Sequence, residues 1–253
     1  MNRRHDDNDE TQVFARVLSH DLGTLIRTAR HLSGYVREDI LRGDADSAMH
    51  AIGMLDLRLA NLDRFVAELI RFYRAGQRAM TLEQFSVSAI VKSVFQKGGF
   101  PASAELRLSA SHDLVLTDQV MLRTVLKELF ENAFVHHPEP AELTIDVDVS
   151  QTPDSRTIVI VRDNGLGLRS LDSKSVFQPF VKNSPRANSV GLGLAICKRE
   201  LAAVGGEICI QPVKKGLAVA LILPTVADLP SQQDRPRIER IDDNDDAPNL
   251  RIV

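Results

Sequence analysis

The segment "DQVMLRTVLKELFENAFVHH" (118–137) decides the fold, because it predicts a strong helix in the middle of several short strands. Two runs of alternating polarity follow it, "AELTIDVDVS" (141–150) and "RTIVIVRDN" (156–164), and together they predict a β-hairpin. Interleaved helices and strands of this kind predict a two-layer α/β sandwich with a mixed sheet. The remaining expected elements are helices at 85–96 and 191–206 and strands at 104–110, 114–117, 206–212 and 217–224.

A helical hairpin is expected upstream of the sandwich. From about Thr11 to Leu41 apolar residues recur at helical spacing, and from Ile52 to Tyr73 their steps alternate between three and four. The run "RGDADS" (42–47) supplies a turn with helix-capping side chains. Two such antiparallel helices leave an apolar stripe that a hairpin cannot bury alone, so we expect a second copy to complete a dimeric four-helix bundle.

These patterns divide the chain into four parts and place it in the α+β class. We expect a flexible N-terminus (1–10), a helical hairpin (11–76), the α/β sandwich (77–226) and an acidic linker or tail (227–253). The final "NLRIV" is either the first strand of a further domain or a terminal tail, so the chain is either whole or a fragment.

Composition narrows the class of protein. The 253 residues carry a net charge of -3 and only 5% aromatic residues, which argues against nucleic acid and anionic membranes as partners. No apolar run is long enough to span a membrane, and the N-terminus lacks the core of a signal peptide. The two cysteines, Cys197 and Cys209, have neither zinc-ligand spacing nor the density of a disulfide scaffold, so a cytoplasmic location is expected.

Two signals suggest a site for a phosphate ester. Glu128 and Asn132 lie one helical turn apart, so their oxygens can hold a hard cation such as Mg²⁺, although for an isolated pair a solvated helix face is the better explanation. In "DNGLGL" (163–168), Asp163 can accept a hydrogen bond from an exocyclic amine, while Gly165 and Gly167 permit close approach of a ligand. An ordinary turn is the alternative for that motif.

Three more signals lie on either side of these. In "VFQPF" (176–180) the aromatic pair either anchors a loop or packs in the core. In "SVGLGLAI" (189–196) glycines open a helix whose first N–H groups can attract phosphate, or else form a common turn. "LSHDLGTLIRTARHL" (18–32) places His20 on an amphipathic helix, where a lone histidine is usually structural.

Five motifs, taken in order, resemble the H, N, G1, F and G2 boxes of bacterial sensor histidine kinases: "SHDL", "ELFENA", "DNGLGL", "FQPF" and "GLGLAICK". Among these kinases the phytochrome-type subgroup is the most similar. The resemblance runs from about residue 11 to residue 226. No GxxxxGK[ST] motif is present, so it implies the ATP-binding fold shared with gyrase- and chaperone-type ATPases.

The resemblance implies that His20 takes the γ-phosphoryl group of ATP, that Asp21 stabilises the developing charge, and that Thr24 orients water for phosphatase activity. It implies a homodimer, and a response-regulator receiver domain, in trans or from a missing C-terminal domain, as the next phosphoryl acceptor. Asn132 would ligate Mg²⁺ with help from Glu128, and residues 169–190 would form a lid over the nucleotide. The other implied nucleotide-binding residues are His136, Asp163, Gly165, Gly167, Phe180, Lys182, Arg186, Gly191, Leu192 and Gly193, with Lys182 and Arg186 either reaching the terminal phosphates or simply solvated.

Three positions depart from the family pattern. Leu25 stands where a proline is usual, Val135 where a basic residue is usual, and Ser189 where the last box begins with glycine. Two alternatives to an active kinase therefore stay open. One is a phosphotransferase or pseudokinase scaffold that keeps His20 without useful ATP turnover, and the other is an ATPase that the hairpin only dimerises.

Overall fold

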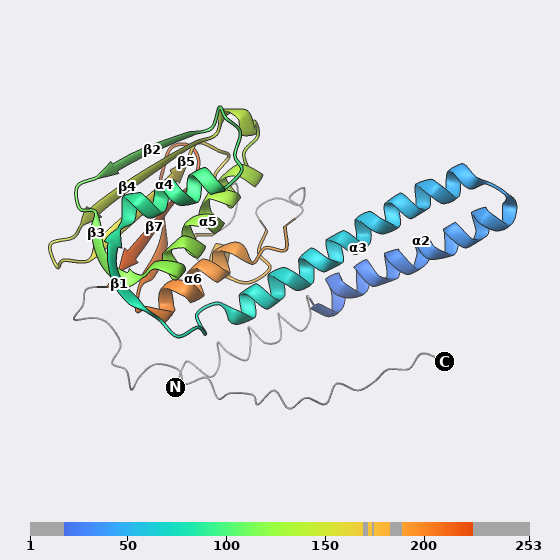
Figure 1. The fold of residues 1–253 in the computed structure, drawn as a ribbon, viewed down its shortest axis with the longest axis horizontal. Coiled ribbons are helices and arrows are strands. Elements are labelled where there is room, and N and C mark those ends of the chain that lie inside the picture. The colour runs from blue at the N-terminus through green and yellow to red at the C-terminus, as the bar shows by residue number, and fades with distance from the viewer. Residues whose placement is uncertain (1–17, 169–171, 174, 183–188, 225–253) are drawn as a thin grey trace.

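The computed structural model describes residues 18–168, 172–173, 175–182 and 189–224. They form a long helical hairpin that extends from an α/β sandwich (Figure 1). The hairpin consists of a π-helical turn, η1 (Leu18–Leu22), followed by α2 (Gly23–Arg42) and α3 (Ala45–Arg74), which lie side by side. This confirms the helical hairpin expected from the apolar spacing.

The connection between the two helices is shorter than the six residues expected. It consists of Gly43 and Asp44, because the Asp44 carboxylate accepts a hydrogen bond from the Ser47 N–H over 3.0 Å and α3 begins at Ala45. The capping residue is therefore the one that fixes the start of α3.

The sandwich contains a five-stranded mixed sheet in the order β2-β4-β5-β7-β6 and a two-stranded sheet of β1 and β3. The expected hairpin is present, with β4 antiparallel to β5 and Val147 opposite Val161, while β2 runs parallel to β4. The strands are β1 (Leu82–Ser86), β2 (Glu105–Ala110), β3 (Leu114–Asp118), β4 (Thr144–Gln151), β5 (Thr157–Asp163), β6 (Glu207–Gln211) and β7 (Ala218–Leu223).

Three helices cover one face of the five-stranded sheet (Figure 1). They are α4 (Val87–Lys97), α5 (Gln119–Val135) and α6 (Gly193–Ala203). A short 3-10 turn precedes β4, η2 (Pro140–Glu142), and another precedes α6, η3 (Ser175–Phe177). Fully buried residues of α5, among them Leu126 and Phe130, pack with residues of the sheet such as Ile145 and Leu221. The two-layer fold class is therefore confirmed.

Helix α4 begins later in the chain than the sequence pattern predicts. The pattern at 85–96 predicts a helix from Phe85, but Phe85 and Ser86 end strand β1, which pairs with β3. The Ser86 hydroxyl then accepts the Ala89 N–H over 3.0 Å and starts α4 one residue later. The preference of Ser86 for the capping position overrides the apolar spacing across it.

An apolar cluster joins the end of α3 to α6. Phe65 and Phe72 of α3 are buried with Leu192 and Ile196. The Arg199 guanidinium lies 4.0 Å above the centre of the Phe72 ring and donates a hydrogen bond to the Phe72 carbonyl oxygen over 3.3 Å. These contacts place one side of α3 against the mouth of the pocket described next.

Candidate functional site

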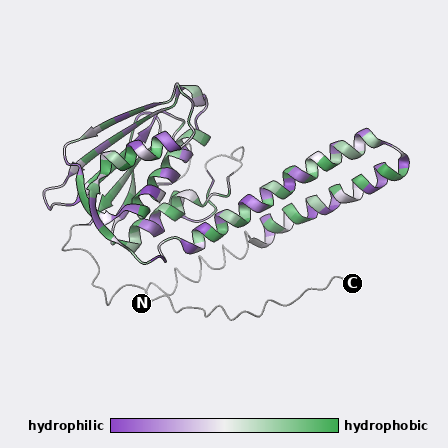
Figure 2. Ribbon diagram, viewed as in Figure 1, coloured by the Kyte–Doolittle hydropathy of each residue, from purple (hydrophilic) through white to green (hydrophobic). Residues whose placement is uncertain are grey.

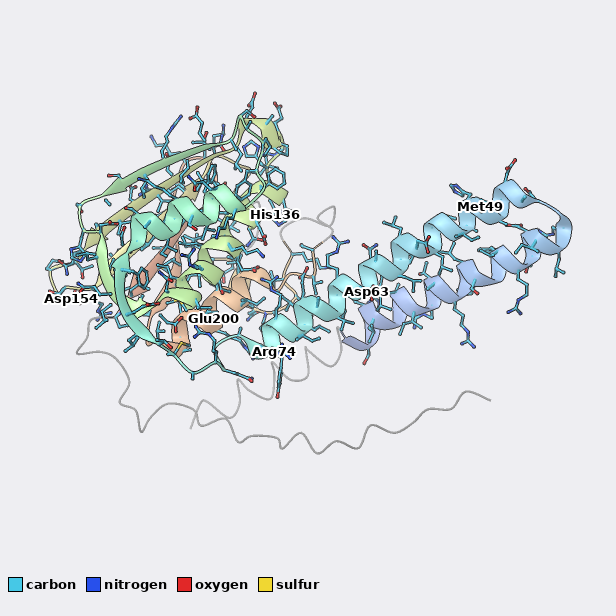
Figure 3. The ribbon with its side chains drawn as sticks, viewed as in Figure 1. Met49, Asp63, Arg74, His136, Asp154 and Glu200 are labelled. Carbon is cyan, nitrogen blue, oxygen red and sulfur yellow. The ribbon has the colours of Figure 1, made fainter. Side chains whose placement is uncertain are left out.

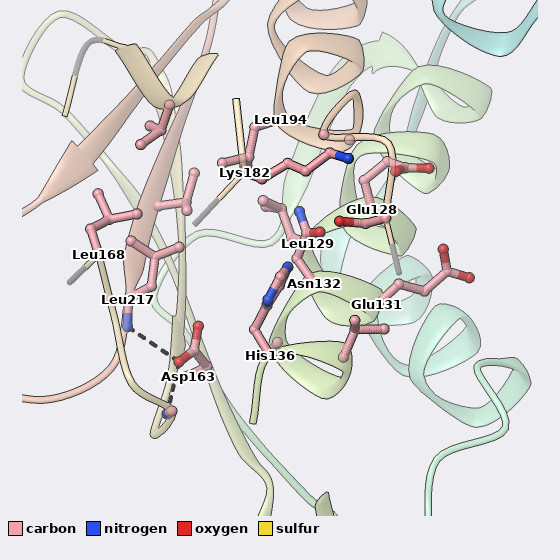
Figure 4. A pocket seen from close by; sticks show the side chains of 18 of the residues that line it. Glu128, Leu129, Glu131, Asn132, His136, Asp163, Leu168, Lys182, Leu194 and Leu217 are labelled. Atoms are coloured by element: carbon pink, nitrogen blue, oxygen red, sulfur yellow. Dashed lines mark hydrogen bonds between the residues drawn. The ribbon is translucent and has the colours of Figure 1, made fainter. Parts of the chain in front are cut away.

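A pocket lies between α5, the turn after β5 and the start of α6, with α3 forming one wall. Figure 4 shows Glu128, Asn132 and Lys182 on one side of it and Asp163 and Leu217 on the other. Most residues expected to bind a nucleotide come together here: Glu128, Asn132, His136, Asp163, Gly165, Gly167, Lys182, Gly191, Leu192 and Gly193.

One end of the pocket is built by α5 and the first turn of α6. A Cβ atom added to Gly193 would lie 2.9 Å from Glu128 Oε2 and 3.3 Å from Asn132 Nδ2, so both side chains are in close contact with the beginning of α6. The first N–H groups of a helix lack partners within it and carry partial positive charge. Carboxylate and amide oxygens therefore meet an anion-binding helix start at this end.

Asp163 defines the other end. Its Oδ1 atom accepts hydrogen bonds from the Gly165 N–H over 2.8 Å and the Leu217 N–H over 3.2 Å (Figure 4). Burial raises the pKa of Asp163 above its ordinary value, and these two hydrogen bonds oppose that rise. Because both bonds fall on Oδ1, Oδ2 is placed to accept a hydrogen bond from a ligand amine. Apolar side chains of the adjoining strands line the pocket on this side: Val161, Leu217 and Val219.

A hydrogen-bonded histidine supports the turn that carries Asp163. His137 Nδ1 accepts the Glu139 N–H over 3.1 Å, so the proton of a neutral ring lies on Nε2, which is 3.0 Å from Asn164 Oδ1. Asn164 Oδ1 also accepts the Thr144 N–H over 2.9 Å. No local pattern predicts this pair, because His137 and Asn164 are 27 residues apart. The neighbouring His136 lines the pocket, and burial lowers its pKa.

The segment just before α6 packs against residues 180–182, which lie earlier in the chain. Gly191 has a φ of 84°, and a Cβ atom there would lie 2.8 Å from the Val181 carbonyl oxygen, so only glycine fits. The Phe180 N–H donates to the Gly191 carbonyl oxygen over 2.8 Å. Within the described part of the chain, the Phe180 side chain packs in the cluster between α3 and α6 rather than along the pocket. Arg186 lies in the segment 183–188, which is outside the described residues.

The expected phosphoryl acceptor is on the hairpin. His20 is 77% exposed, and its Nδ1 atom lies 2.9 Å from Asp21 Oδ1. The Thr24 hydroxyl donates to the His20 carbonyl oxygen over 2.7 Å and accepts a hydrogen bond from Arg27 Nη2 over 3.0 Å. Among the residues that the structure describes, these side chains lie outside the pocket lining. The structure thus groups His20 with its expected helpers but apart from the nucleotide site.

Two pocket residues come from α3 and were missed by the sequence analysis. Glu68 and Arg71 line the pocket, and Arg71 forms an ion pair with Glu128 of α5. Their spacing of three residues on an amphipathic helix is that of any solvated charged pair. Only the packing of α3 on the sandwich shows that they belong to the site.

Comparison with known proteins relates the sandwich to a family of ATPases. Residues 117–227 match the family described as histidine kinase-, DNA gyrase B-, and HSP90-like ATPase. The chain is 28% identical over 232 residues to the methanogenesis regulatory histidine kinase FilI of Methanothrix harundinacea (strain 6Ac), covering 86% of this chain and 25% of that protein. The chain carries a sensor histidine kinase core.

Solved structures agree with the fold of the kinase core. The Acinetobacter baumannii histidine kinase AdeS superposes with a TM-score of 0.59 at 20% identity, over 82% of this chain and 98% of AdeS. Histidine kinase ThkA, solved in complex with the response regulator protein TrrA, gives a TM-score of 0.56 at 16% identity, over 88% of this chain and 66% of that one. The chain spans only 21% to 46% of the length of its first curated relatives.

The donor set of the kinase core fits a metal ion carried by a nucleotide. Within the described ranges, no three His, Cys, Asp or Glu side chains are arranged to hold a metal ion. Mg²⁺ in nucleotide sites is commonly held by one or two protein oxygens together with phosphates and water. Glu128 and Asn132 supply such oxygens at the helix start of α6.

None of the described helices has both the length and the apolar character needed to cross a bilayer.

Proposed function

We propose that this chain uses ATP to phosphorylate His20 and then passes the phosphoryl group to an aspartate of a response-regulator receiver domain. The observation that carries the proposal is the single pocket in which Asp163 faces an apolar end and Glu128 and Asn132 face the start of α6. This is the arrangement that a purine with a chain of phosphates requires.

The nucleotide would lie along the pocket with its base at Asp163. Oδ2 of Asp163 accepts a hydrogen bond from the exocyclic amine of adenine, and Leu217 and Val219 contact the ring. The phosphates extend toward the N–H groups at Gly193 and toward Lys182. We expect Arg186 to add a second cation from outside the described residues.

Asn132 and Glu128 would hold Mg²⁺, which neutralises charge on the phosphates when it is bound. Glu128 is well placed for this role because its side chain is only 8% exposed and touches the helix start of α6. The ion pair with Arg71 holds the carboxylate in this orientation.

The chemical step requires a nucleophilic ring nitrogen at His20. In the neutral ring the Nδ1–H group donates a hydrogen bond to the Asp21 carboxylate, which leaves the lone pair of Nε2 to attack the γ-phosphorus. A nitrogen–phosphorus bond forms, the bond between the γ-phosphorus and the bridging oxygen breaks, and ADP leaves. Asp21 stabilises the ring cation and then takes its proton. Thr24, one turn further on, would orient water when the same core removes phosphate from the regulator.

Transfer also requires that a nucleotide pocket come close to His20. We expect this to happen within a dimer formed by the hairpin. Exposed apolar side chains run along the hairpin, including Tyr35, Ile40, Met49 and Leu57, and apolar segments are visible on both helices (Figure 2; Met49 is marked in Figure 3). A second copy of the chain buries them in a four-helix bundle. ThkA was solved with a response regulator. We expect a receiver domain to bind to this chain beside the exposed His20, and we expect the transfer to take place in the cytoplasm.

A phosphotransferase scaffold with little ATP turnover is the second candidate. Val135 is 55% exposed and lines the pocket, at the position where the family pattern has a basic residue, and Ser189 also lines the pocket. A chain of this kind would accept phosphate on His20 from a phosphorylated regulator without using ATP.

Incubation with γ-labelled ATP and Mg²⁺ separates these functions. Alkali-stable, acid-labile label in the wild type, lost in His20→Gln and kept in His31→Gln, supports the kinase. His31 is the matched control because it is an exposed histidine on α2, the helix that follows η1. Label that enters only from a phosphorylated regulator supports the scaffold. Hydrolysis of ATP at an equal rate in wild type and His20→Gln, without label on the protein, indicates an ATPase.

A further inference from the structure

The nucleotide pocket is not made by the sandwich alone. Glu68 and Arg71, near the end of α3, line it together with Glu128, Asn132 and Gly193. Arg71 Nη2 contacts Glu128 Oε1, and the other oxygen of the same carboxylate, Oε2, lies against Gly193. One carboxylate thus separates the Arg71 guanidinium from the helix start that attracts phosphate.

The guanidinium can serve Glu128 and an anion at once. Arginine carries five N–H donors in a planar fork, and the contact with Glu128 occupies one nitrogen. The Arg71 side chain is 42% exposed, whereas Glu128 is 8% exposed, so the arginine lies on the open side of the pair. A phosphate oxygen beside Gly193 can therefore meet the fork without breaking the ion pair.

The Arg71 guanidinium offsets negative charge in the pocket. Four carboxylates line the pocket, those of Glu68, Glu128, Glu131 and Asp163. Among the described lining residues the permanent cations are Lys182 and Arg71, while burial lowers the pKa of His136 and favours its neutral form. A third phosphate adds negative charge to a site that is already acidic, so its binding depends on the cations that it reaches.

The position of Arg71 is fixed by how α3 packs on the sandwich. One turn earlier, the Glu68 carboxylate accepts the Val190 N–H, and burial raises its pKa. One residue later, Phe72 is buried beneath the Arg199 guanidinium. Arg71 therefore lies between two residues whose side chains are fixed, at the place where α3 packs against α6.

We propose that Arg71 is a phosphate-binding residue that the hairpin supplies to the pocket, and that it distinguishes ATP from ADP by contacting the terminal phosphate. The inference rests on the proposed function, because it presupposes that the pocket binds adenine nucleotides. Linkage then makes the effect reciprocal: a triphosphate strengthens the packing of α3 on the sandwich more than a diphosphate does.

Calorimetric titration of the full chain with Mg²⁺-AMPPNP and with Mg²⁺-ADP tests the proposal. In Arg71→Gln the affinity for AMPPNP should fall about tenfold or more relative to that for ADP, as expected for one lost charge-assisted hydrogen bond. Arg71→Lys, which keeps the charge without the fork, should lose less. Arg74→Gln is the matched control, an exposed arginine at the end of the same helix, and should leave both affinities unchanged (Figure 3).

Repeating the titrations in EDTA separates direct contact from an effect through Glu128 and the metal ion. Selective loss of AMPPNP affinity that persists without Mg²⁺ supports direct contact, whereas selectivity that vanishes in EDTA overturns it. Equal losses for both nucleotides, or none, assign Arg71 a structural role only. A wild type that binds both nucleotides and labels His20 keeps the proposed function intact in that case, whereas a wild type that binds neither nucleotide overturns both.

Discussion

The imidazole of His20 is hydrogen-bonded to the carboxylate of its own neighbour, Asp21, with 2.9 Å between Nδ1 and Oδ1. Consecutive side chains of a regular α-helix diverge and do not face each other. Here the pair lies in η1, a π-helical turn that precedes α2. The contact leaves Nε2 of the neutral ring as the basic nitrogen.

Replacing Asp21 by asparagine should slow phosphorylation of His20 by about a hundredfold, the range of a lost general base. The amide can still occupy the same place but neither takes a proton nor stabilises a ring cation. Initial rates of acid-labile labelling with γ-labelled ATP measure the effect. Because the Asp21 side chain is 37% exposed and contacts the exposed His20, we expect no change in the unfolding midpoint.

Asp63→Asn is the control for this variant, since Asp63 is an exposed carboxylate on α3 (Figure 3). It should label at the wild-type rate. If Asp21→Asn also labels at that rate, the contact between His20 and Asp21 has no part in the phosphoryl transfer.

Gly193 should tolerate no side chain without a loss of nucleotide affinity. A Cβ atom there meets Glu128 Oε2 at 2.9 Å and Asn132 Nδ2 at 3.3 Å, so Gly193→Ala must displace both from the start of α6. We expect Mg²⁺-ADP to bind about tenfold more weakly, as when one good polar contact is lost.

The matched control is Gly53→Ala in α3, where an added Cβ meets nothing within 4 Å. This change should raise the free energy of unfolding by about 0.5 to 1 kcal/mol through helix propensity and leave ADP affinity unchanged. Unaltered ADP binding by Gly193→Ala would mean that Glu128 and Asn132 do not contact the nucleotide or its metal ion.

Elements with a strong local signal were predicted well. The alternation of "IDVDV" and "IVIV" predicted β4 and β5 and their pairing, because alternate residues of each strand are buried on one face. The box residues on α5, after β5 and at α6 were predicted to share a site, and the pocket brings them together. In each case the chemistry is written within a few residues of chain.

Relationships between distant segments were not predictable in this way. The pairing of β1 with β3 and the parallel pairing of β2 with β4 depend on how the chain returns through space. Arg71 and Glu128 are 57 residues apart, and nothing in either local pattern links them. Phe180, expected at the nucleotide, instead packs between α3 and α6, because the segment around it is held by the Gly191 carbonyl oxygen.

Phe72 should couple the hairpin to the sandwich. It is 4% exposed, packs with Leu192 and Ile196, and lies beneath Arg199. Phe72→Ala should cost about 3 kcal/mol or more, from lost burial and the cavity left behind.

Urea denaturation followed by circular dichroism measures this cost. The control Val213→Ala, at a side chain that is 40% exposed, should change the free energy of unfolding by less than about 0.5 kcal/mol. A cost for Phe72→Ala no larger than the control would show that α3 and α6 do not depend on each other for stability.

The ion pair of Asp118 and Arg78 should make stability depend on acid pH. Burial alone would raise the pKa of Asp118, but hydrogen bonds from Arg78 and from the Met121 and Thr81 N–H groups outweigh it and hold the pKa below its ordinary value of 3.8. The folded state then binds a proton less readily than the unfolded state. The stabilisation is complete above that ordinary value and is lost as the pH falls through the lowered pKa of the folded state.

In Asp118→Asn the free energy of unfolding should fall by about 2 kcal/mol near neutral pH, since the amide loses the charge that Arg78 faces and keeps one acceptor oxygen in place of the two that accept the Met121 and Thr81 N–H groups. The difference between variant and wild type should shrink as the pH falls below 3.8, because protonation removes the same charge from the wild type. Urea midpoints measured across this range test the prediction, with Glu83→Gln, an exposed position on β1, as the control. A difference that stays constant with pH would mean that the charge of Asp118 does not stabilise the fold.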